Sequence, residues 1–386
     1  MSVGFELRKF VAPEFIFGVG ARSLAGRYAK NLGGRKILVV SDPGVVAAGW
    51  TKDVTDSLVE AGLPFALFTS VSPNPKVDEI MAGVALYHAE RCNALVAVGG
   101  GSAIDCAKGI GIVASNDRHI LLFEGVDMVR LPMPPLICVP TTGGTSADVS
   151  QFVIISNPLE KVKFAIISKS VVPDLALIDP ATLTTMDSYL TACTGLDALT
   201  HAIEAYVSTA RSAMTDLHAI EAIRLISVNL LPSIANLGDL ELRSNVMQGS
   251  LQAGLAFSNA ILGATHAMAH SLGGALDIAH GECNAILLDH VIAFNQPTAP
   301  ERFEHIAEAM GLDLRGKTSV QKKSALLNHI RELKTAAGVD RTLKELGVGR
   351  DDVKFLTKHA LKDPCMATNP RKASKRDIEV VYEESL

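Results

Sequence analysis

The first half of the chain alternates short apolar, β-branched runs with segments of helical periodicity. We predict buried strands at residues 35–42, 64–69, 93–102 and 135–142. Residues 150–156 and 161–168 are two further apolar runs, and the turn between them predicts a hairpin. Because strands that alternate with helices form parallel sheets, we expect an α/β domain with helices on both faces of its sheet.

The pattern changes near Thr185, after which apolar residues recur three and four positions apart and no strand is predicted. Residues 190–208 and 218–234 are clear examples of this helical spacing. A chain of 386 residues is also longer than one hydrophobic core usually supports. We therefore predict an α/β nucleotide-binding domain over residues 1–185 and an all-α, helical domain over residues 186–386.

One long run inside the helical half, Ser244–Leu276, contains no Asp, Glu, Lys or Arg. Its length raises the possibility of a membrane span. Its polar Ser, Asn, Gln and His side chains and the pair Gly273-Gly274 instead favour a helix buried inside a large soluble protein. We therefore expect no membrane partner.

The composition narrows the functional class further. A net charge of -5 leaves no basic footprint, which argues against nucleic acid as a partner. The N-terminal residues carry charges where a signal peptide needs an apolar core. The six cysteines form no CxxC pair, which favours reduced thiols. Together these features predict a cytoplasmic protein.

Three glycines, Gly99, Gly100 and Gly101, end the strand at 93–102 and precede a helix that begins near Ser102. Glycines let the backbone approach a ligand closely, and a helix N-terminus offers free N–H groups to an anion such as a dinucleotide pyrophosphate. The alternative is a tight turn closed by a capping box between Ser102 and Asp105. A second segment rich in glycine and hydroxyl groups, residues 139–150, favours the nucleotide interpretation.

Asp42 ends the first predicted strand, where a carboxylate can accept hydrogen bonds from a ribose. A carboxylate there also repels a 2′-phosphate, which favours NAD over NADP. The alternative is that Asp42 is only the first residue of an Asp-Pro-Gly turn.

Histidines in the charge-poor helical half predict a metal site. Asp197 and His201 are four apart on one predicted helix, and His266 and His270 repeat that spacing on another. His280 follows beside a glycine that ends or bends the chain. One carboxylate with two or three imidazoles suits Fe²⁺ or Zn²⁺. The spacing does not decide which of the last three histidines bind, and each alone is compatible with a hydrogen-bonded core residue.

Several segments together resemble the iron-containing (group III) alcohol dehydrogenases. They are residues 99–108 (GGGSAIDCAK), 140–145 (PTTGGT), 161–166 (KVKFAI), 195–206 (GLDALTHAIEAY) and 256–281 (AFSNAILGATHAMAHSLGG…HG). The resemblance extends from about residue 10 to the end of the chain. It implies an N-terminal nucleotide domain, a C-terminal helical domain and an active site in the cleft between them.

The resemblance also implies roles for individual residues. The implied metal ligands are Asp197, His201, His266 and His280, and His270 lines the site near the nicotinamide and the substrate. The implied NAD contacts are Asp42, Asn74, Gly99, Gly100, Gly101, Ser102, Thr141, Thr142 and Lys163. The residues implied to face the substrate are Gln151, Phe257 and Cys365. The chain departs from the family pattern at Asp148, where Glu is common, and at Ala279, where Pro is common.

We therefore expect a metal-dependent enzyme that interconverts a small primary alcohol and its aldehyde by hydride transfer with NAD(H). The expected metal is Fe²⁺, with Zn²⁺ as the alternative, and His270 is the expected proton relay. The alternatives are a zinc polyol dehydrogenase of the glycerol dehydrogenase type and a non-catalytic metal- and nucleotide-binding assembly protein. The family forms dimers or larger rings, so a homo-oligomer is expected.

Overall fold

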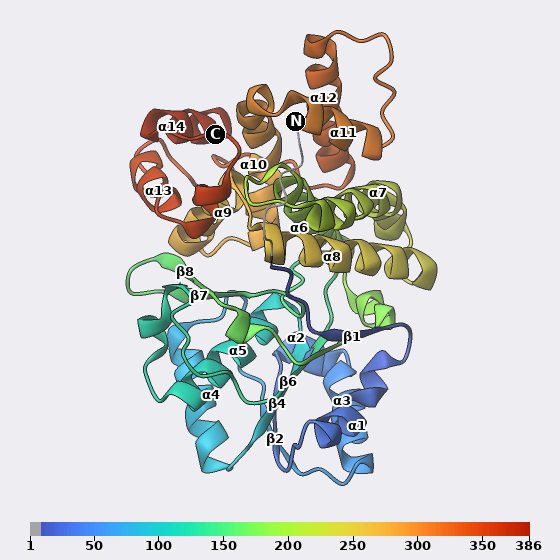
Figure 1. Ribbon diagram of the computed structural model, residues 1–386, viewed down its shortest axis with the longest axis vertical. Helices are drawn as coiled ribbons and strands as arrows, with labels where there is room; N and C mark the ends of the chain where they lie inside the picture. Colours follow the sequence, from blue (N-terminus) through green and yellow to red (C-terminus); the bar gives the residue numbers. More distant parts are fainter. Residues whose placement is uncertain (1–8) are drawn as a thin grey trace.

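A six-stranded sheet, parallel throughout, organises the first half of the computed structural model, which describes residues 9–386 (Figure 1). Its strand order is β1-β9-β6-β4-β2-β3. The strands are β1 (Glu14–Phe17), β2 (Ile37–Val40), β3 (Phe65–Phe68), β4 (Ala94–Gly99), β6 (Leu136–Pro140) and β9 (Leu175–Ile178). Four of these confirm predicted strands. Strands β1 and β9, which pair with each other, were not predicted, because each has only four residues and the two lie about 160 residues apart in the chain.

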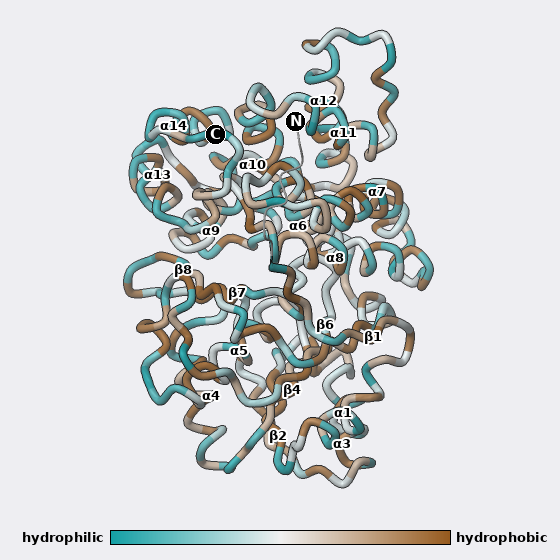
Figure 2. The backbone as a smooth tube through the Cα atoms, viewed as in Figure 1, coloured by the Kyte–Doolittle hydropathy of each residue, from teal (hydrophilic) through white to brown (hydrophobic). Residues whose placement is uncertain are grey.

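Helices cover both faces of this sheet, as the apolar runs require. In β2, Leu38 and Val40 pack toward α4 (Val77–Ala89) and α5 (Gly101–Asn116). Their neighbours Ile37 and Val39 pack toward the other face, which is covered by α1 (Ala25–Asn31) and α3 (Trp50–Glu60). Burial on both sides explains why these strands are continuously apolar instead of alternating. Figure 2 shows the strands β2 and β4 in the brown of hydrophobic residues.

The predicted hairpin is confirmed as β7 (Phe152–Asn157) and β8 (Val162–Ile167), which pair antiparallel. The short strand β5 (Gly125–Val126) joins β8 in parallel to complete a three-stranded sheet. The hairpin lies beneath α9 (Ala264–Leu276). A Cβ on Gly274 would lie 2.6 Å from the Lys163 backbone nitrogen, so glycine is required where α9 meets β8. This contact places Lys163 next to α9.

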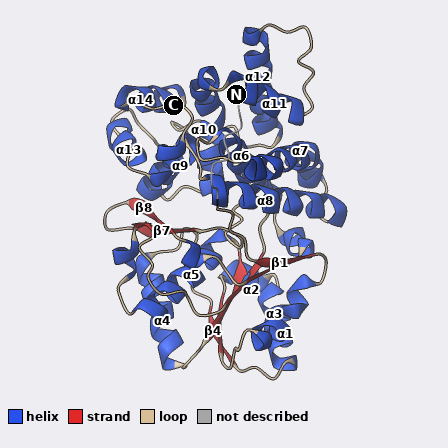
Figure 3. Ribbon diagram, in the orientation of Figure 1, coloured by secondary structure: helices blue, strands red, loops and turns tan. Residues whose placement is uncertain are grey.

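The second half of the chain is helical, and residues 179–386 contain no strand (Figure 3). A 3₁₀ segment, η4 (Pro180–Thr185), leads into it. Its α-helices are α6 (Ser188–Val207), α7 (Ala213–Ala235), α8 (Leu240–Ala260), α9 (Ala264–Leu276), α10 (His280–Asn295), α11 (Pro300–Ala309), α12 (Ser319–Ala336), α13 (Val353–Ala360) and α14 (Lys375–Glu384). Two short 3₁₀ segments, η5 (Gln296–Thr298) and η6 (Pro364–Thr368), interrupt them.

By length and composition alone, α7 is apolar enough to cross a membrane. Its buried residues, among them Ala219, Ile223 and Ile226, belong to the same hydrophobic cluster as residues of α6 and α8. A core helix of a soluble protein passes the same test of length and composition. The packing of α7 is that of a core helix.

The charge-free run from Ser244 to Leu276 forms two helices, which corrects the prediction of a single one. The run breaks between α8 and α9 at residues 261–263, where Ile261 adopts a left-handed φ of 60°. An L-residue with a branched side chain rarely adopts this conformation, so tertiary contacts must hold the break in place. The break turns α9 so that it lies on the hairpin, with His266 and His270 on its first two turns.

Candidate metal centre and active-site cleft

Four side chains from three helices converge at one point. Asp197 and His201 are one turn apart on α6, His266 lies in the first turn of α9, and His280 begins α10. One potential ligand atom of each lies within 4.8 Å of the other three. Two ligands about 2.1 Å from one ion are separated by roughly 3–4 Å. Asp197 Oδ1 lies 3.6 Å from His266 Nε2 and 3.7 Å from His280 Nε2, so the donor set fits one divalent ion.

The electrostatics of the cluster favour a bound cation. Burial alone raises the pKa of Asp197, but the nearby His201 and His280 hold this pKa below its usual value. Burial lowers the pKa of His201 to about 4 and that of His280 well below its usual value. Burial also lowers the pKa of His266, but its contacts with Asp197 and Glu204 outweigh burial and raise it to about 9. Two carboxylates, Asp197 and Glu204, thus lie next to the His266 ring in a buried site.

His270 belongs to the same face of α9 but has a different partner. Its Nδ1 lies 2.8 Å from Asp363 Oδ2, and its ring stacks on that of His280 with the centroids 5.2 Å apart. His270 and Asp363 form a second cluster with Cys365, whose backbone nitrogen donates to Asp363 Oδ1. The structure thus separates His270 from the four-residue cluster, although the one-turn spacing from His266 made both of them candidates.

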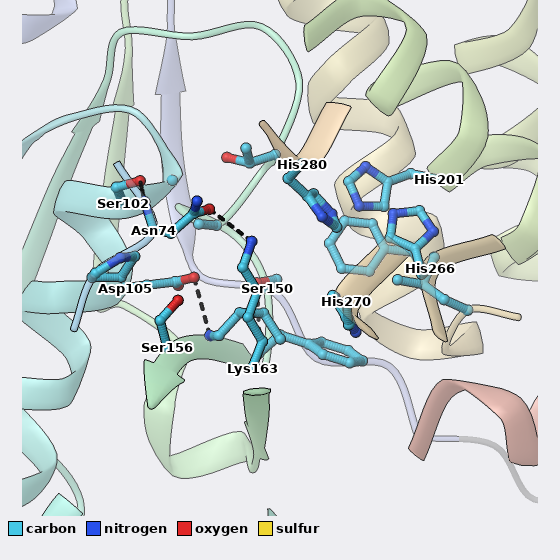
Figure 4. Close-up of a pocket in the computed structure, with 18 residues that line it drawn as sticks. Asn74, Ser102, Asp105, Ser150, Ser156, Lys163, His201, His266, His270 and His280 are labelled. Atoms are coloured by element: carbon cyan, nitrogen blue, oxygen red, sulfur yellow. Dashed lines mark hydrogen bonds between the residues drawn. The ribbon is translucent and has the colours of Figure 1, made fainter. Parts of the chain in front are cut away.

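Two connected cavities reach this cluster. The inner cavity, with an empty volume of about 680 Å³, is lined by His201, His266, His270 and His280 on the helical side. Asn74, Ser102 and Lys163 line its opposite side, as Figure 4 shows. The outer cleft has an empty volume of about 1860 Å³. The two share Asn74, Gly101, Ser102, Thr145 and His280, so a ligand in the outer cleft can extend to the histidines.

In the glycine turn after β4, neighbouring side chains lie so close to the backbone that there is no space for a Cβ atom. A Cβ on Gly100 would lie 2.9 Å from Thr142 Cγ2, and one on Gly101 would lie 2.9 Å from Thr145 Cγ2. Gly99 has a φ of +157°, and a Cβ there would meet that of Ala103 at 2.6 Å. No larger residue fits this turn, which lies at the carboxyl edge of the sheet where α5 begins.

The capping box considered as an alternative does not form. The N-cap of α5 is Gly100, and no side chain caps this helix. Ser102 Oγ instead accepts a hydrogen bond from Asn74 N, and Asp105 Oδ2 accepts one from Ile154 N. The start of α5 therefore lacks the side-chain cap that would compete with an anion for its N–H groups.

Asp42, Thr141 and Thr142 all line the outer cleft. Asp42 is the N-cap of α2 (Pro43–Ala47) and accepts a hydrogen bond from Val45 N at 3.0 Å. The turn interpretation of Asp42 is therefore correct locally, and it is compatible with a ribose contact because a carboxylate has two oxygens. Thr142 Oγ1 is buried and has no protein partner within residues 9–386.

Asn74 and Lys163 form a polar bridge above the inner cavity. Lys163 Nζ donates to Asn74 Oδ1 at 2.7 Å, and Asn74 Nδ2 donates to Asp277 Oδ1 at 2.7 Å. Asn74 precedes α4 of the sheet layer, whereas Asp277 follows α9 of the helical half. The bridge thus connects the two layers at the junction of the two cavities.

Of the three residues predicted to face the substrate, one lines the inner cavity. Phe257 does so, and its ring stacks on that of His201 with the centroids 4.2 Å apart. Gln151 does not, because its Nε2 donates to Ser258 O at 2.6 Å and holds the side chain against α8. Cys365 does not either, because its side chain is fully buried in the main hydrophobic cluster.

Sequence reasoning missed three acidic residues of the site. Asp105 lines the inner cavity, and burial raises its pKa to about 6. Asp363 orients His270, and Glu204 contacts His266. Glu204 had a detectable signal, because Asp197, His201 and Glu204 follow the i, i+4, i+7 spacing of one helix face. No sequence pattern indicated Asp363, because it contacts His270 from 93 positions away in the chain.

Family comparisons agree with the class of protein that this fold and site define, a metal- and nucleotide-dependent dehydrogenase. The model described as iron-containing alcohol dehydrogenase matches residues 12–180. The model described as Fe-containing alcohol dehydrogenase family, C-terminal, matches residues 191–386. The chain belongs to the iron-containing alcohol dehydrogenase family.

Individual relatives extend over nearly the whole chain. The 1,3-propanediol dehydrogenase of Klebsiella pneumoniae is 40% identical over 99% of this chain and 100% of its own. The NAD-dependent methanol dehydrogenase of Bacillus methanolicus is 35% identical over 98% of this chain and 99% of its own. The crystal structure of a 1,3-propanediol oxidoreductase superposes with a TM-score of 0.95 at 38% identity, covering 99% and 100% of the two chains. The protein is accordingly an iron-type oxidoreductase that interconverts an alcohol and an aldehyde with NAD(H).

Proposed function

We propose that the substrate is a small primary alcohol or its aldehyde, and that Asp197, His201, His266 and His280 hold the metal. The observation that carries this proposal is the convergence of these four ligand atoms beside a cavity that opens into the glycine-lined cleft. The resident ion is proposed to be Fe²⁺, with Zn²⁺ as the alternative that the same ligands accept. When bound, the ion supplies Lewis-acid polarisation of the substrate oxygen.

The sheet domain holds the nucleotide in this proposal. The uncapped start of α5 and its glycine turn offer N–H groups to the pyrophosphate, and Asp42 accepts hydrogen bonds from a ribose. The nicotinamide would then extend through the boundary shared by the two cavities, beneath Lys163 and Asn74, and reach the histidines. Hydride transfer requires such close and oriented contact between the ring and the substrate carbon.

His270 is proposed to move the proton that accompanies hydride transfer. It lines the inner cavity, and Asp363 holds its Nδ1. That hydrogen bond fixes the ring and leaves Nε2 as the nitrogen for proton exchange. Its position next to the metal cluster supports exchange of this proton with the substrate oxygen.

The wall of the inner cavity supports a short aliphatic substrate. Phe152, Phe257 and Leu262 line it, and the two phenyl rings meet edge to face with the centroids 5.6 Å apart. Rigid apolar side chains in a small cavity favour small alkyl groups. Two of the relatives are named for small alcohols, 1,3-propanediol and methanol, which supports a small substrate here as well. They favour alcohol chemistry over a glycerol-dehydrogenase-like polyol enzyme or a non-catalytic assembly protein.

The test is an anaerobic reconstitution of metal-free protein. Fe²⁺ or Zn²⁺ would be added separately, and NADH consumption followed with a panel of short aldehydes. We expect turnover only after metal addition, and none in His266→Ala, which retains the nucleotide cleft. Turnover by metal-stripped protein would refute the role given to the four ligands.

We also propose a cytoplasmic homo-oligomer. All six cysteines are free and buried, in keeping with a reducing compartment. The edge strand β1 presents Phe15, which is 41% exposed, to the surface. Light scattering of the purified protein would measure the mass of the assembly, and cell fractionation would test the location.

A further inference from the structure

Glu204 is an acidic residue in the hydrophobic core of the helical half. It lies one turn beyond His201 on α6, and its side chain is 4% exposed. Its flanking residues Ala202, Ile203, Ala205 and Tyr206 all belong to the main hydrophobic cluster. Burying a carboxylate among such residues is costly unless hydrogen bonds and opposite charge compensate it. Retention of an acid there calls for a function.

The contacts of Glu204 converge on His266 and on the start of α9. Its Oε1 accepts a hydrogen bond from Thr265 N at 2.6 Å. Its Oε2 accepts one from Gly263 N at 3.0 Å and lies 2.8 Å from His266 Nδ1. The carboxylate thus caps α9 and contacts the ring nitrogen of a proposed metal ligand at the same time.

We infer that Glu204 is a positioning residue for the metal, one that fixes the tautomer of His266 and supplies the second negative charge of the site. The inference rests on the proposed function, because it takes His266 as a ligand. An ionised carboxylate can only accept hydrogen bonds, so His266 Nδ1 must carry the proton. His266 Nε2 then presents its lone pair to the cluster, as a metal ligand must.

The other edge of the His266 ring faces the four-residue cluster. Asn284 Nδ2 lies 3.0 Å from His266 Nε2 and 2.7 Å from Asp197 Oδ1. His266 Nε2 therefore faces the other members of the cluster, whereas Nδ1 faces Glu204. In contrast, His280 Nδ1 is buried without a protein partner among residues 9–386. His266 is thus a proposed ligand whose remote nitrogen is held by a carboxylate.

Charge balance gives the second part of the role. Asp197 and Glu204 together carry two negative charges, which match one divalent ion surrounded by neutral imidazoles. In a buried site an unbalanced charge is penalised strongly. Removing the charge of Glu204 should therefore weaken metal binding even where the fold is intact.

The test separates this role from simple capping of α9. Glu204→Gln keeps the size of the side chain, removes the charge and provides one oxygen where the carboxylate provides two. Asn369→Ala is the matched control, because Asn369 Oδ1 accepts the hydrogen bond of Ala264 N at the same helix start without touching His266. Affinity for Zn²⁺ and Fe²⁺ would be measured anaerobically by competition with a chelator, alongside the melting temperature of each metal-free protein.

We expect Glu204→Gln to lose about 10–100-fold in metal affinity, the range typical for residues that hydrogen-bond to a metal ligand. Asn369→Ala should bind metal like the unaltered protein although it is less stable. Equal metal affinity in Glu204→Gln and Asn369→Ala would overturn the inference and leave Glu204 a helix cap. If Glu204→Gln fails to fold, Glu204→Asp, which retains the charge on a shorter side chain, is expected to show a smaller loss than His266→Ala. Loss equal to that of His266→Ala would contradict the charge-balance argument.

Failure of the proposed function has a different signature. Unaltered protein that binds neither ion with measurable affinity would refute the metal site itself, whatever the variants do. Metal binding that is tight in the unaltered protein and insensitive to Glu204→Gln would refute only the role of Glu204.

Discussion

Asn74 and Asp277, which are 203 positions apart in the chain, are joined by a hydrogen bond of 2.7 Å between Asn74 Nδ2 and Asp277 Oδ1. Both residues have a left-handed φ, 58° for Asn74 and 55° for Asp277. Both also line the outer cleft. The sheet layer and the helical half are therefore bonded to each other across the proposed nucleotide site, so widening of the cleft must break this contact.

This bond predicts an effect on nucleotide release. Asp277→Gly removes the acceptor and still tolerates the left-handed φ, whereas Asp277→Asn keeps an oxygen at that position. A hydrogen bond contributes about 0.5–1.5 kcal/mol, so NADH should dissociate roughly 2–10-fold faster from Asp277→Gly than from Asp277→Asn. Stopped-flow fluorescence of NADH measures both rates. Equal rates in the two variants would show that the bond does not limit opening.

The pairing of His270 with Asp363 predicts a chemical rescue. His270→Ala should lower kcat by about 10²–10⁴-fold, the usual contribution of a general acid or base. Metal content should stay unchanged, because His270 is separate from the four-residue cluster. Added imidazole should restore part of the activity by entering the vacated space. An unaltered kcat, or a proportional loss of metal, would assign His270 another role.

The N-cap position of Asp42 allows a selective test of nucleotide preference. Asp42→Ser removes the charge but keeps a side-chain oxygen to cap α2, so local structure should persist. With the repulsion of a 2′-phosphate removed, kcat/KM for NADPH should rise about tenfold relative to that for NADH. Steady-state kinetics with both nucleotides measures this ratio. A constant ratio would mean that Asp42 acts only as a cap.

Asp148 predicts a pH-dependent stability. Burial raises the pKa of Asp148 from its usual 3.8 to about 6. Between about pH 4 and 6 the folded protein therefore holds a proton that the unfolded chain has lost, so ionisation in the folded state is destabilising and stability falls as pH rises. Asp148→Asn mimics the protonated form, and its advantage over the unaltered protein should grow through this range to about 3 kcal/mol. Denaturant unfolding at pH 4 to 8 measures this difference, and a constant difference would contradict it.

Much of the fold follows from local pattern. The apolar runs that became β2, β4 and β6 are buried on both faces, so their composition already required a covered parallel sheet. The one-turn spacing of Asp197 and His201 fixed their common direction, because helical period is a local property. By contrast, β1 and the break at Ile261 were not predicted, since β1 depends on pairing with β9 and the break on contacts at the start of α9.

The amino-acid sequence by itself determined the two-part architecture, the glycine turn after β4 and a cluster of imidazoles in a charge-free region. From the residues alone it left His266, His270 and His280 equivalent. Only the tertiary structure separated them, because Glu204 holds His266 and Asp363 holds His270. It also placed Gln151 and Cys365 outside the cavity. Helical period and strand burial are set within a few residues, whereas a hydrogen-bond partner is set by segments that meet only after the chain has folded.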